Sequence, residues 1–337
     1  MINHVYQLIA PRSIFVKHVD VPLHSMPLVQ PEYLAICKAD QRYFQGRRDQ
    51  QVMRKKLPMA LIHECCGRIV WDPTQNFSVG ERVVLIPNVP PSDIGCIYEN
   101  YAKGSHFLSS GYDGFMRELI PISPDRIIPY SSMDAQVAAI TEFVSVAVHA
   151  SIRFNLIAHE KRNRIGIWGD GNLSYVLAAV LKKRFPQISI IVIGHQLQKL
   201  AHFSFVDETY LSSDLPADFH VDHAFECCGG EGSSYAIRDM IRYVDPQGVL
   251  LLLGVSENAV AVETRMVLEK GLTLVGCSRS GRHDFEVASK LMELPDFQRQ
   301  LRRILNDAGA VRTIEDIYRV FDEDFSTTFK TVFRWEL

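Results

Sequence analysis

The stretch Ile165-Gly166-Ile167-Trp168-Gly169-Asp170-Gly171-Asn172-Leu173-Ser174 decides the fold of one part of the chain. An apolar run ends in two closely spaced glycines, and a sequence with helical spacing follows. The first glycine permits a sharp turn, and the second lets the backbone approach a pyrophosphate at the start of the helix. An ordinary tight turn is the alternative. We predict that five residues of this turn contact a dinucleotide: Gly169, Asp170, Gly171, Asn172 and Leu173.

The residues around and after this turn alternate between strand-like and helix-like runs. Continuous apolar runs separated by helices indicate parallel strands that are covered on both faces. The predicted fold class is therefore α/β, with a doubly wound parallel sheet. Strands are expected at 164–168, 188–193, 224–227, 248–253 and 272–277, and helices at 172–185, 234–244 and 265–270. Such sheets bind ligands beyond the carboxyl ends of their strands. This rule predicts further cofactor contacts after the late strands, by Gly254, Val255, Ser256 and Ser278.

The end of the second predicted strand bears on which dinucleotide is bound. NAD sites usually place Asp or Glu there, as the acceptor for the ribose 2′-hydroxyl. In this chain Gly194 and His195 end the strand, Lys199 follows shortly after, and the first acid is Asp207. Gly194 would leave room for a 2′-phosphate, and His195 or Lys199 would supply positive charge. The sequence therefore favours NADP over NAD, although the histidine could be structural and the lysine solvated.

The first part of the chain has a different pattern of predicted elements, with short strands separated by turns and a long loop at 87–114. A mostly apolar stretch at 135–153 has helical spacing and predicts one long helix. The closing run Lys330-Thr331-Val332-Phe333-Arg334-Trp335 predicts an edge strand. We expect a mainly β catalytic domain, a cofactor domain and a segment that returns to the catalytic domain, at 1–150, 151–290 and 291–337 respectively.

Composition and charge favour a folded globular protein over a nucleic-acid-binding, membrane or disulfide-rich one. The chain has 337 residues, 47% of them hydrophobic and 22% charged, which suits about two folded domains. Its net charge of −3 argues against nucleic acid or an anionic membrane as the main partner. No apolar run approaches the roughly 18 residues of a membrane span. The seven cysteines include two adjacent pairs, a poor disulfide framework that suits a reducing compartment. We expect a cytoplasmic protein.

Four residues of the first part can together bind a metal ion: Cys37, His63, Glu64 and Glu142. A thiolate, an imidazole and carboxylates are ligands of catalytic zinc, which keeps one position open for water or substrate. Their spacing alone is weak evidence, and a single cysteine is more often a small buried hydrophobe. The cofactor turn downstream strengthens the metal interpretation, because a metal site followed by a dinucleotide site indicates a dehydrogenase.

The motifs around these residues resemble those of the zinc-dependent medium-chain alcohol dehydrogenases, in the order of that family. They are Cys37-Lys38-Ala39-Asp40, His63-Glu64-Cys65-Cys66-Gly67, Gly80-Glu81-Arg82-Val83 and Thr141-Glu142-Phe143-Val144-Ser145-Val146-Ala147-Val148-His149-Ala150. The resemblance covers almost the whole chain and implies a GroES-like catalytic domain. It implies that Cys37 and His63 bind zinc, with Glu142 as a further ligand and Glu64 as a ligand or near-ligand that exchanges with water. Asp40 would orient the imidazole, so Glu64 and Asp40 are the expected catalytic residues.

Three positions depart from the family pattern. Ala39 lacks the Ser or Thr hydroxyl that relays a proton, Ile62 replaces a glycine, and Phe143 replaces a proline. The loop 88–114 contains only Cys96, whereas many relatives hold a structural zinc there with four cysteines. The resemblance therefore implies one catalytic zinc and no structural zinc.

A narrower resemblance, to the ribulose-5-phosphate reductases, includes the Ala39 and Ile62 departures. It is carried by residues 37–46, 59–64, 110–116, 168–171, 205–211, 253–258 and 264–274. It implies NADPH-dependent reduction of D-ribulose 5-phosphate to D-ribitol 5-phosphate by a homodimer. It also implies a cytidylyltransferase partner, which makes CDP-ribitol for teichoic acid or capsule polymers.

The sequence does not show which residues bind the phosphate group of the substrate. The candidates are basic residues, each of which could equally be solvated: Lys38, Arg42, Arg47, Arg48 and Arg279. Two other functions stay open. One is an NAD(P)-dependent dehydrogenase of a free polyol such as sorbitol or xylitol, and the other is a non-catalytic nucleotide-binding scaffold.

Overall fold

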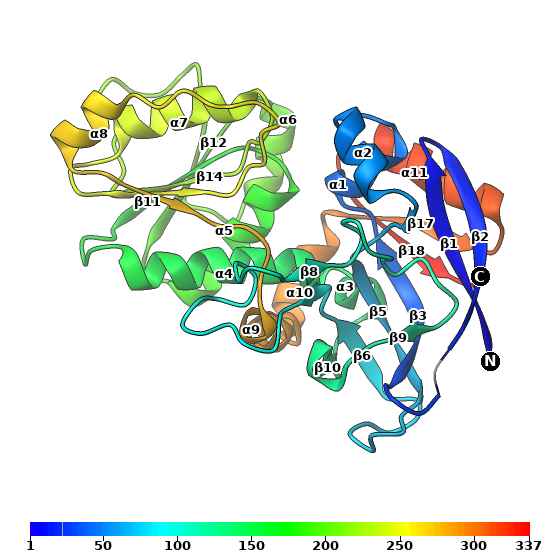
Figure 1. Ribbon diagram of the computed structural model, residues 1–337. Coiled ribbons are helices and arrows are strands. Elements are labelled where there is room, and N and C mark those ends of the chain that lie inside the picture. Colours follow the sequence, from blue (N-terminus) through cyan, green and yellow to red (C-terminus); the bar gives the residue numbers. More distant parts are fainter. Residues whose placement is uncertain (22) are drawn as a thin grey trace. The chain divides into compact units, whose positions relative to one another are not determined.

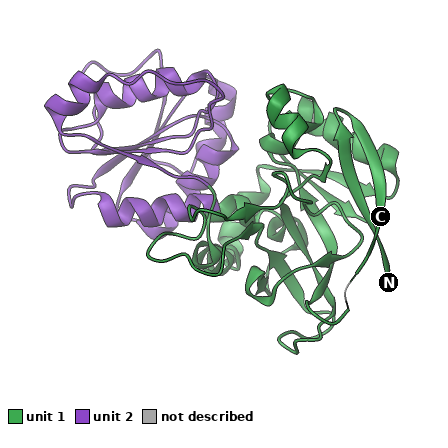
Figure 2. Cartoon of the chain, viewed as in Figure 1, with its two compact units in different colours: residues 1–145, 279–337 green, residues 146–278 purple. Residues whose placement is uncertain are grey.

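The computed structural model describes residues 1–21 and 23–337. The chain forms two compact units, which Figure 2 shows in different colours. Unit 1 contains Met1–Ser145 and Arg279–Leu337, and unit 2 contains Val146–Ser278. The chain therefore leaves unit 1 once and returns to it once.

The return to unit 1 begins at Arg279, earlier than the boundary near 290 expected from the sequence. Hydrogen bonds tie the segment after this residue to unit 1. The Oγ atoms of Ser280 and Ser145 are 2.6 Å apart, and the backbone N–H of Arg282 donates to Glu99 Oε1 at 2.7 Å. These bonds explain why the segment belongs to unit 1.

Unit 2 is built on a six-stranded parallel sheet. In pairing order the strands are β13 (Glu208–Leu211), β12 (Ser189–Gly194), β11 (Arg164–Trp168), β14 (His223–Glu226), β15 (Val249–Leu252) and β16 (Thr273–Gly276). The order reverses between β11 and β14, where sheets of this kind bind ligands. This topology confirms the predicted α/β class and doubly wound parallel sheet, and it adds β13, a strand that the sequence analysis lacked.

Helices cover both faces of this sheet (Figure 1). The helical elements are α4 (Thr141–Ile157), α5 (Asn172–Arg184), α6 (Leu197–Leu200), η2 (Ala201–Phe203), α7 (Gly232–Tyr243) and α8 (Thr264–Lys270). Two neighbouring residues of β14 show the two faces. Ala224 belongs to an apolar cluster with Ile237 and Met240 of α7. Phe225 lies against Phe154 of α4, with ring centroids 5.5 Å apart.

Unit 1 is mainly β, as predicted. Its larger sheet contains, in pairing order, β10 (Ile127–Pro129), β6 (Arg82–Leu85), β5 (Glu64–Trp71), β3 (Leu28–Ala35), β18 (Lys330–Trp335) and β17 (Leu305–Val311), with β9 (Ile120–Pro121) beside β3. The other strands are β2 (Ser13–Asp20), β1 (Ile2–Ala10) and β4 (Met59–Ala60) in one sheet, and β7 (Asn88–Val89) with β8 (His106–Phe107) in another. The helical elements of unit 1 are α1 (Lys38–Phe44), α2 (Gln50–Lys56), η1 (Pro124–Arg126), α3 (Ala135–Ala138), α9 (Arg282–Met292), α10 (Pro295–Arg302) and α11 (Ile314–Ser326).

Two predictions about unit 1 were wrong in detail. The closing strand β18 is not an edge strand, because it pairs antiparallel with β3 and parallel with β17. The long helix predicted at 135–153 is divided into α3 and α4. At the break, the side chain of Thr141 donates to the backbone oxygen of Ala138 at 2.7 Å, within the last turn of α3. The new helix start places Glu142 in the first turn of α4.

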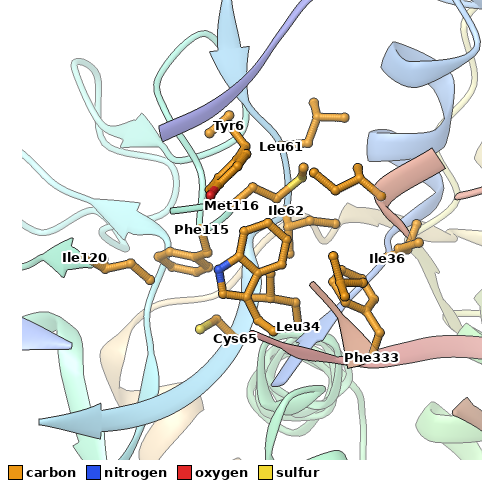
Figure 3. Packing of buried hydrophobic residues seen from close by; sticks show 14 of the residues in the cluster. Tyr6, Leu34, Ile36, Leu61, Ile62, Cys65, Phe115, Met116, Ile120 and Phe333 are labelled. Atoms are coloured by element: carbon orange, nitrogen blue, oxygen red, sulfur yellow. The ribbon is translucent and has the colours of Figure 1, made fainter. Parts of the chain in front are cut away.

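An apolar core supports the strands of unit 1 (Figure 3). Tyr6 of β1, Leu34 of β3 and Phe333 of β18 are among its buried side chains. Burying an aliphatic or aromatic side chain of this size contributes roughly 1.5–3 kcal/mol. Ile36 and Ile62 also belong to this core, and each directly precedes a candidate metal ligand in the chain. The core therefore holds the backbone at the points where two ligands project.

All seven cysteines lie in the described part of the chain and are free. The thiols of Cys65 and Cys66 are buried; burial raises the pKa of Cys66 to about 12 and that of Cys65 well above its ordinary value. Neither thiol is therefore a reactive thiolate at neutral pH. Among the described residues, no helix has both the length and the hydropathy needed to cross a bilayer.

Candidate metal and cofactor sites

Three neighbouring strands of unit 1 bring together the first candidate residues. Cys37 lies two residues after the end of β3, at the start of α1, and Glu64 of β5 pairs with Ala35 at the end of β3. On the other side of β3, Lys330 opens β18. Its Nζ donates to the backbone oxygen of Ile36 at 2.9 Å and forms a buried ion pair with Glu64 Oε1. The sheet topology thus joins residues from opposite ends of the sequence.

Asp40 links three segments around His63. Its Oδ2 accepts a hydrogen bond from the backbone N–H of Cys37 at 3.1 Å. Its Oδ1 accepts from the backbone N–H of Ile62 at 3.0 Å and from Ser109 Oγ at 2.6 Å. Oδ2 also lies 3.6 Å from Nδ1 of His63, at ion-pair distance. The buried carboxylate is therefore positioned to orient the imidazole, which is the role the resemblance implied.

The backbone before His63 is strained. Ile62 has φ of 69°, in the left-handed region that a β-branched residue rarely adopts. Glycine, which the wider family pattern has at this position, adopts such a φ without this strain. A strain of order 1–3 kcal/mol persists only where the surroundings enforce it. Here the backbone oxygen of Ile62 accepts from the N–H of Phe115 at 2.7 Å. Gly114 permits this approach, since a Cβ there would lie 2.3 Å from that oxygen.

The candidate ligands converge on His63. Donor atoms of Cys37, Asp40 and His63 lie within 4.8 Å of one another, and so do those of His63, Glu64 and Glu142. Two buried atoms in this cluster, His63 Nδ1 and Glu64 Oε2, have no hydrogen-bond partner among the described residues. Leaving a buried polar atom unsatisfied costs about 1–3 kcal/mol, and a cation bound beside His63 would satisfy the Glu64 oxygen. Sulfur, imidazole and carboxylate donors fit zinc.

The carboxylates of Glu64 and Glu142 are buried beside the cation of Lys330. Burial raises the pKa of Glu64 to about 7, while Lys330 opposes the rise and Glu142 adds to it. Burial also raises the pKa of Glu142, against the attraction of His63 and Lys330. Burial acts to lower the pKa of Lys330, but Glu64 outweighs it, so the pKa is raised and the lysine stays charged. A metal dication would favour ionisation of both carboxylates, so metal binding should release protons.

Sequence reasoning missed Lys330 and Ser109. Lys330 is 266 positions from Glu64, and a single lysine at the start of a strand carries no functional signal. The ring of Phe143, one of the three departures from the family pattern, lies 4.7 Å from its Nζ. Ser109 directly precedes the stretch 110–116 of the narrower resemblance, which was the one hint available.

The glycine turn in unit 2 connects β11 to α5, as predicted. Gly169 has φ of 132°, and a Cβ there would lie 2.7 Å from the buried Oγ of Ser174. Gly171 precedes α5, and no described atom lies within 4 Å of the place a Cβ would occupy. The first glycine is required by close packing, whereas the second leaves the backbone open to a ligand.

The end of β12 differs from the expectation. Asp170 reaches this place from the glycine turn, and its Oδ2 accepts from the backbone N–H groups of His195 at 2.8 Å and Gln196 at 2.9 Å. Lys199 Nζ lies 4.0 Å from its Oδ1. Gly194 is required beside this side chain, because a Cβ there would lie 2.7 Å from Cβ of Asp170. An acid is therefore present, with its charge offset by two backbone N–H groups and Lys199.

A buried glutamate organises the loops after β14 and β15. Glu226 Oε1 accepts from the backbone N–H groups of Cys228 and Gly229 at 2.9 Å each and from Ser233 Oγ at 3.0 Å. Its Oε2 accepts from the backbone N–H of Gly254 at 2.8 Å. A Cβ on Gly254 would lie 2.4 Å from this carboxylate, so the position requires glycine. The sequence analysis had no role for Glu226.

The other late-strand candidates lie beyond the same carboxyl ends. The backbone oxygen of Val255 accepts from the N–H of Gly230 at 2.9 Å, and Ser256 Oγ donates to the oxygen of Gly230 at 2.7 Å. Val255 and Ser278 are exposed, and Ser256 is half-buried. The cofactor contacts predicted at this edge of the sheet stay a prediction.

Comparison with known proteins agrees with this architecture. Residues 26–132 match the alcohol dehydrogenase GroES-like domain family. The ribulose-5-phosphate reductase of Streptococcus pneumoniae is 51% identical, over 100% of this chain and 98% of that protein. The ribulose-5-phosphate reductase of Bacillus spizizenii is 47% identical over 100% of both chains. A crystal structure of S. aureus TarJ in complex with NADPH is similar with a TM-score of 0.88 and 41% identity, over 100% of both chains.

A doubly wound parallel sheet, a GroES-like domain and a cluster of thiol, imidazole and carboxylate side chains define a zinc-type medium-chain alcohol dehydrogenase. Within that class, the chain belongs to the family of the ribulose-5-phosphate reductases.

Proposed function

We propose that this protein reduces D-ribulose 5-phosphate to D-ribitol 5-phosphate with NADPH and one zinc ion. The observation that carries the proposal is the match to ribulose-5-phosphate reductases over the full length of the chain, at 51% identity for one of them. The cluster around His63 supports it, because thiol, imidazole and carboxylate donors converge there and the buried Glu64 Oε2 lacks a partner that a cation would provide. In the reaction a hydride passes from NADPH to C2 of the ketose, a proton is added to its oxygen, and NADP⁺ leaves.

Each residue of the metal cluster has a proposed role. Cys37, His63 and Glu142 hold the zinc, and Glu64 is a ligand or exchanges with water. Asp40 keeps the imidazole of His63 in place, supported by its own hydrogen bonds. When bound, zinc polarises the substrate carbonyl as a Lewis acid, and NADPH supplies the hydride. Since residue 39 is alanine, the final proton comes from water or a ribose hydroxyl.

The proposed cofactor contacts all lie in unit 2. Residues 169–173 would hold the pyrophosphate at the start of α5, because Gly171 leaves the backbone open there. His195 and Lys199 would contact the 2′-phosphate, with Asp170 fixing the loop that carries them. Gly254, Val255, Ser256 and Ser278 would border the nicotinamide.

The cellular setting follows from the proposed product. We infer a cytoplasmic homodimer that supplies D-ribitol 5-phosphate to a cytidylyltransferase partner. That enzyme would form CDP-ribitol for teichoic acid or capsular polymers.

A substrate panel read by NADPH absorbance tests the proposal. We expect turnover of D-ribulose 5-phosphate far above that of D-fructose, and no turnover by the Cys37→Ser variant. Preference for a free ketose would instead support the polyol dehydrogenase. A zinc-free preparation that binds NADPH without turnover would support the scaffold.

A further inference from the structure

Arg279 occupies a fixed and unusual position in unit 1. Its φ of 59° is in the left-handed region, which is uncommon for a residue other than glycine. The residues after it are held by the hydrogen bond of Ser280 to Ser145, at 2.6 Å, and by the backbone N–H of Gly281, which donates to Asp284 Oδ2 at 2.8 Å. Strain of this kind tends to occur at ligand sites and is retained only where surrounding contacts enforce it.

The guanidinium of Arg279 lies next to the metal cluster. Its Cζ is 4.6 Å from the ring centroid of Phe107. The ring of Phe107 in turn meets the imidazole of His63 edge to face, with centroids 5.2 Å apart and planes at 61°. Arg279 is therefore one aromatic ring away from the histidine on which the candidate ligands converge.

The charge of Arg279 is not neutralised by an ion pair. Burial lowers the pKa of Arg279 and the carboxylate of Glu142 opposes this change, but an arginine remains charged at neutral pH. Within residues 1–21 and 23–337, no carboxylate lies at ion-pair distance from its guanidinium. Glu142 is the carboxylate that acts on it electrostatically. A cation bound by Glu142 would take up that negative charge and leave the guanidinium in need of an anion.

We propose that Arg279 binds the phosphate group of the substrate and so makes the enzyme prefer phosphorylated over free ketoses. The inference rests on the proposed function, because it concerns the same substrate. A phosphate monoester carries a charge of about −1.5 to −2 at neutral pH. The planar guanidinium offers paired N–H donors that match phosphate oxygens. Stacking on Phe107 holds this donor plane, while the carbonyl end of the substrate, three carbons away, reaches the metal cluster.

The other cations named from the sequence have different surroundings. Arg47 is exposed and stacks on Phe325, with Cζ 4.9 Å from the ring centroid. Arg48 lies over Tyr43 at 5.1 Å, and the charge of Lys38 acts on Asp324. Arg47 thus offers a matched control, because it is an exposed arginine that also stacks on a phenylalanine ring.

The test compares two ketoses in three proteins. Wild type, Arg279→Gln and Arg47→Gln are assayed with D-ribulose 5-phosphate and with D-ribulose, and the zinc content of each is measured. Glutamine has the same conformational strain as arginine at this positive φ, so the variant should still fold. We expect Arg279→Gln to lower kcat/KM for the phosphorylated ketose about 100-fold, mainly through KM. Its activity on D-ribulose and its zinc content should be unchanged, and Arg47→Gln should resemble wild type on both ketoses.

Calorimetric binding of D-ribitol 5-phosphate and ribitol gives a readout independent of turnover, and the same selective loss is expected there. Equal losses on both ketoses, or loss of zinc, would overturn the proposal and make Arg279 a support of Glu142. No loss on either ketose would also overturn it. A wild-type enzyme that shows no preference for the phosphorylated ketose would refute the proposed function itself, and the Arg279 assignment with it.

Discussion

Each unit of this molecule contains a buried histidine and a buried glutamate that lie within three residues of each other in sequence, and the two pairs differ in their hydrogen bonding. In unit 2, Glu226 accepts four hydrogen bonds and both ring nitrogens of His223 bond to backbone groups. In unit 1, His63 Nδ1 and Glu64 Oε2 have no hydrogen-bond partner among the described residues. The fold itself supplies hydrogen-bond partners for the first pair, whereas the second pair keeps buried polar atoms without a partner.

The two histidines also differ in charge preference. Burial lowers the pKa of His223 to about 4, with His159 adding to the effect. Burial acts on His63 in the same direction, but Asp40 and Cys37 outweigh it and raise its pKa well above the ordinary value. A histidine surrounded by anionic groups is suited to a cation, and a histidine held neutral by backbone bonds is suited to a structural role.

The sharpest test of this contrast is His63→Gln against His223→Gln. Loss of a metal ligand should lower kcat/KM by more than about 1000-fold and remove the zinc. The metal-free variant should also be less stable than metal-free wild type, since the attraction between the charged imidazole and Asp40 is lost. His223→Gln should lower the free energy of unfolding by about 2 kcal/mol and keep its zinc. Kinetics, zinc analysis and urea unfolding measure these effects, and a zinc-retaining His63→Gln would reverse the contrast.

Glu226→Gln should destabilise unit 2 without affecting the metal. The amide offers one acceptor oxygen in place of two, so at least one backbone N–H of the loops loses its partner. We expect the free energy of unfolding to fall by about 3 kcal/mol, with zinc content unchanged. Urea unfolding measures the loss, and the exposed Glu257 provides a matched control as Glu257→Gln. A variant as stable as wild type would show that these bonds do not hold the loops.

Asp40→Asn should weaken metal binding indirectly, through the imidazole of His63 that Asp40 orients. In Asp40 one carboxylate oxygen accepts from the backbone N–H of Ile62 and the other from that of Cys37. In asparagine an NH₂ group replaces one of these oxygens, and because it cannot accept, one of the two hydrogen bonds is lost. Loss of a group that orients a ligating histidine typically costs 10–100-fold in metal affinity, so we expect zinc to bind about 10–100-fold more weakly. Competition with a chromogenic chelator measures this change. Unaltered affinity would remove Asp40 from the proposed machinery.

The smallest expected effect is the acid sensitivity that His223 confers. At a pH between the ordinary histidine pKa of 6.5 and the folded pKa of His223, about 4, the unfolded chain binds a proton at this residue that the folded chain does not. Stability should therefore fall as pH decreases through this range, by about 1–2 kcal/mol from this group. Urea unfolding of metal-free protein at several pH values measures the slope. The slope should be shallower in His223→Gln, and an unchanged slope would contradict the assignment.

Much of the architecture was predictable because it depends on local patterns. Continuous apolar strands between helices predicted the doubly wound sheet, and a glycine turn after β11 predicted its ligand-binding edge. The candidate metal ligands could be named because motif order placed Cys37, His63 and Glu142 in a known pattern. Their convergence within the described structure agrees with that expectation.

What could not be predicted depends on approaches between distant segments. Lys330 reaches Glu64 only because β18 inserts between β3 and β17, and this insertion also makes the predicted edge strand an interior one. Asp170 supplies the acid that the sequence around β12 lacks, because a side chain from the glycine turn crosses to that strand end. Glu226 had no motif to mark it, and its role appears only when the loops fold around it.

The measurement that tests the central claim most directly is a zinc titration of metal-free enzyme, monitored by NADPH-dependent reduction of D-ribulose 5-phosphate. The buried cluster around His63 predicts negligible activity without metal, a linear rise with added zinc and a plateau at one zinc ion per chain. Full turnover by the metal-free enzyme, or a plateau that needs a second ion, would contradict the account.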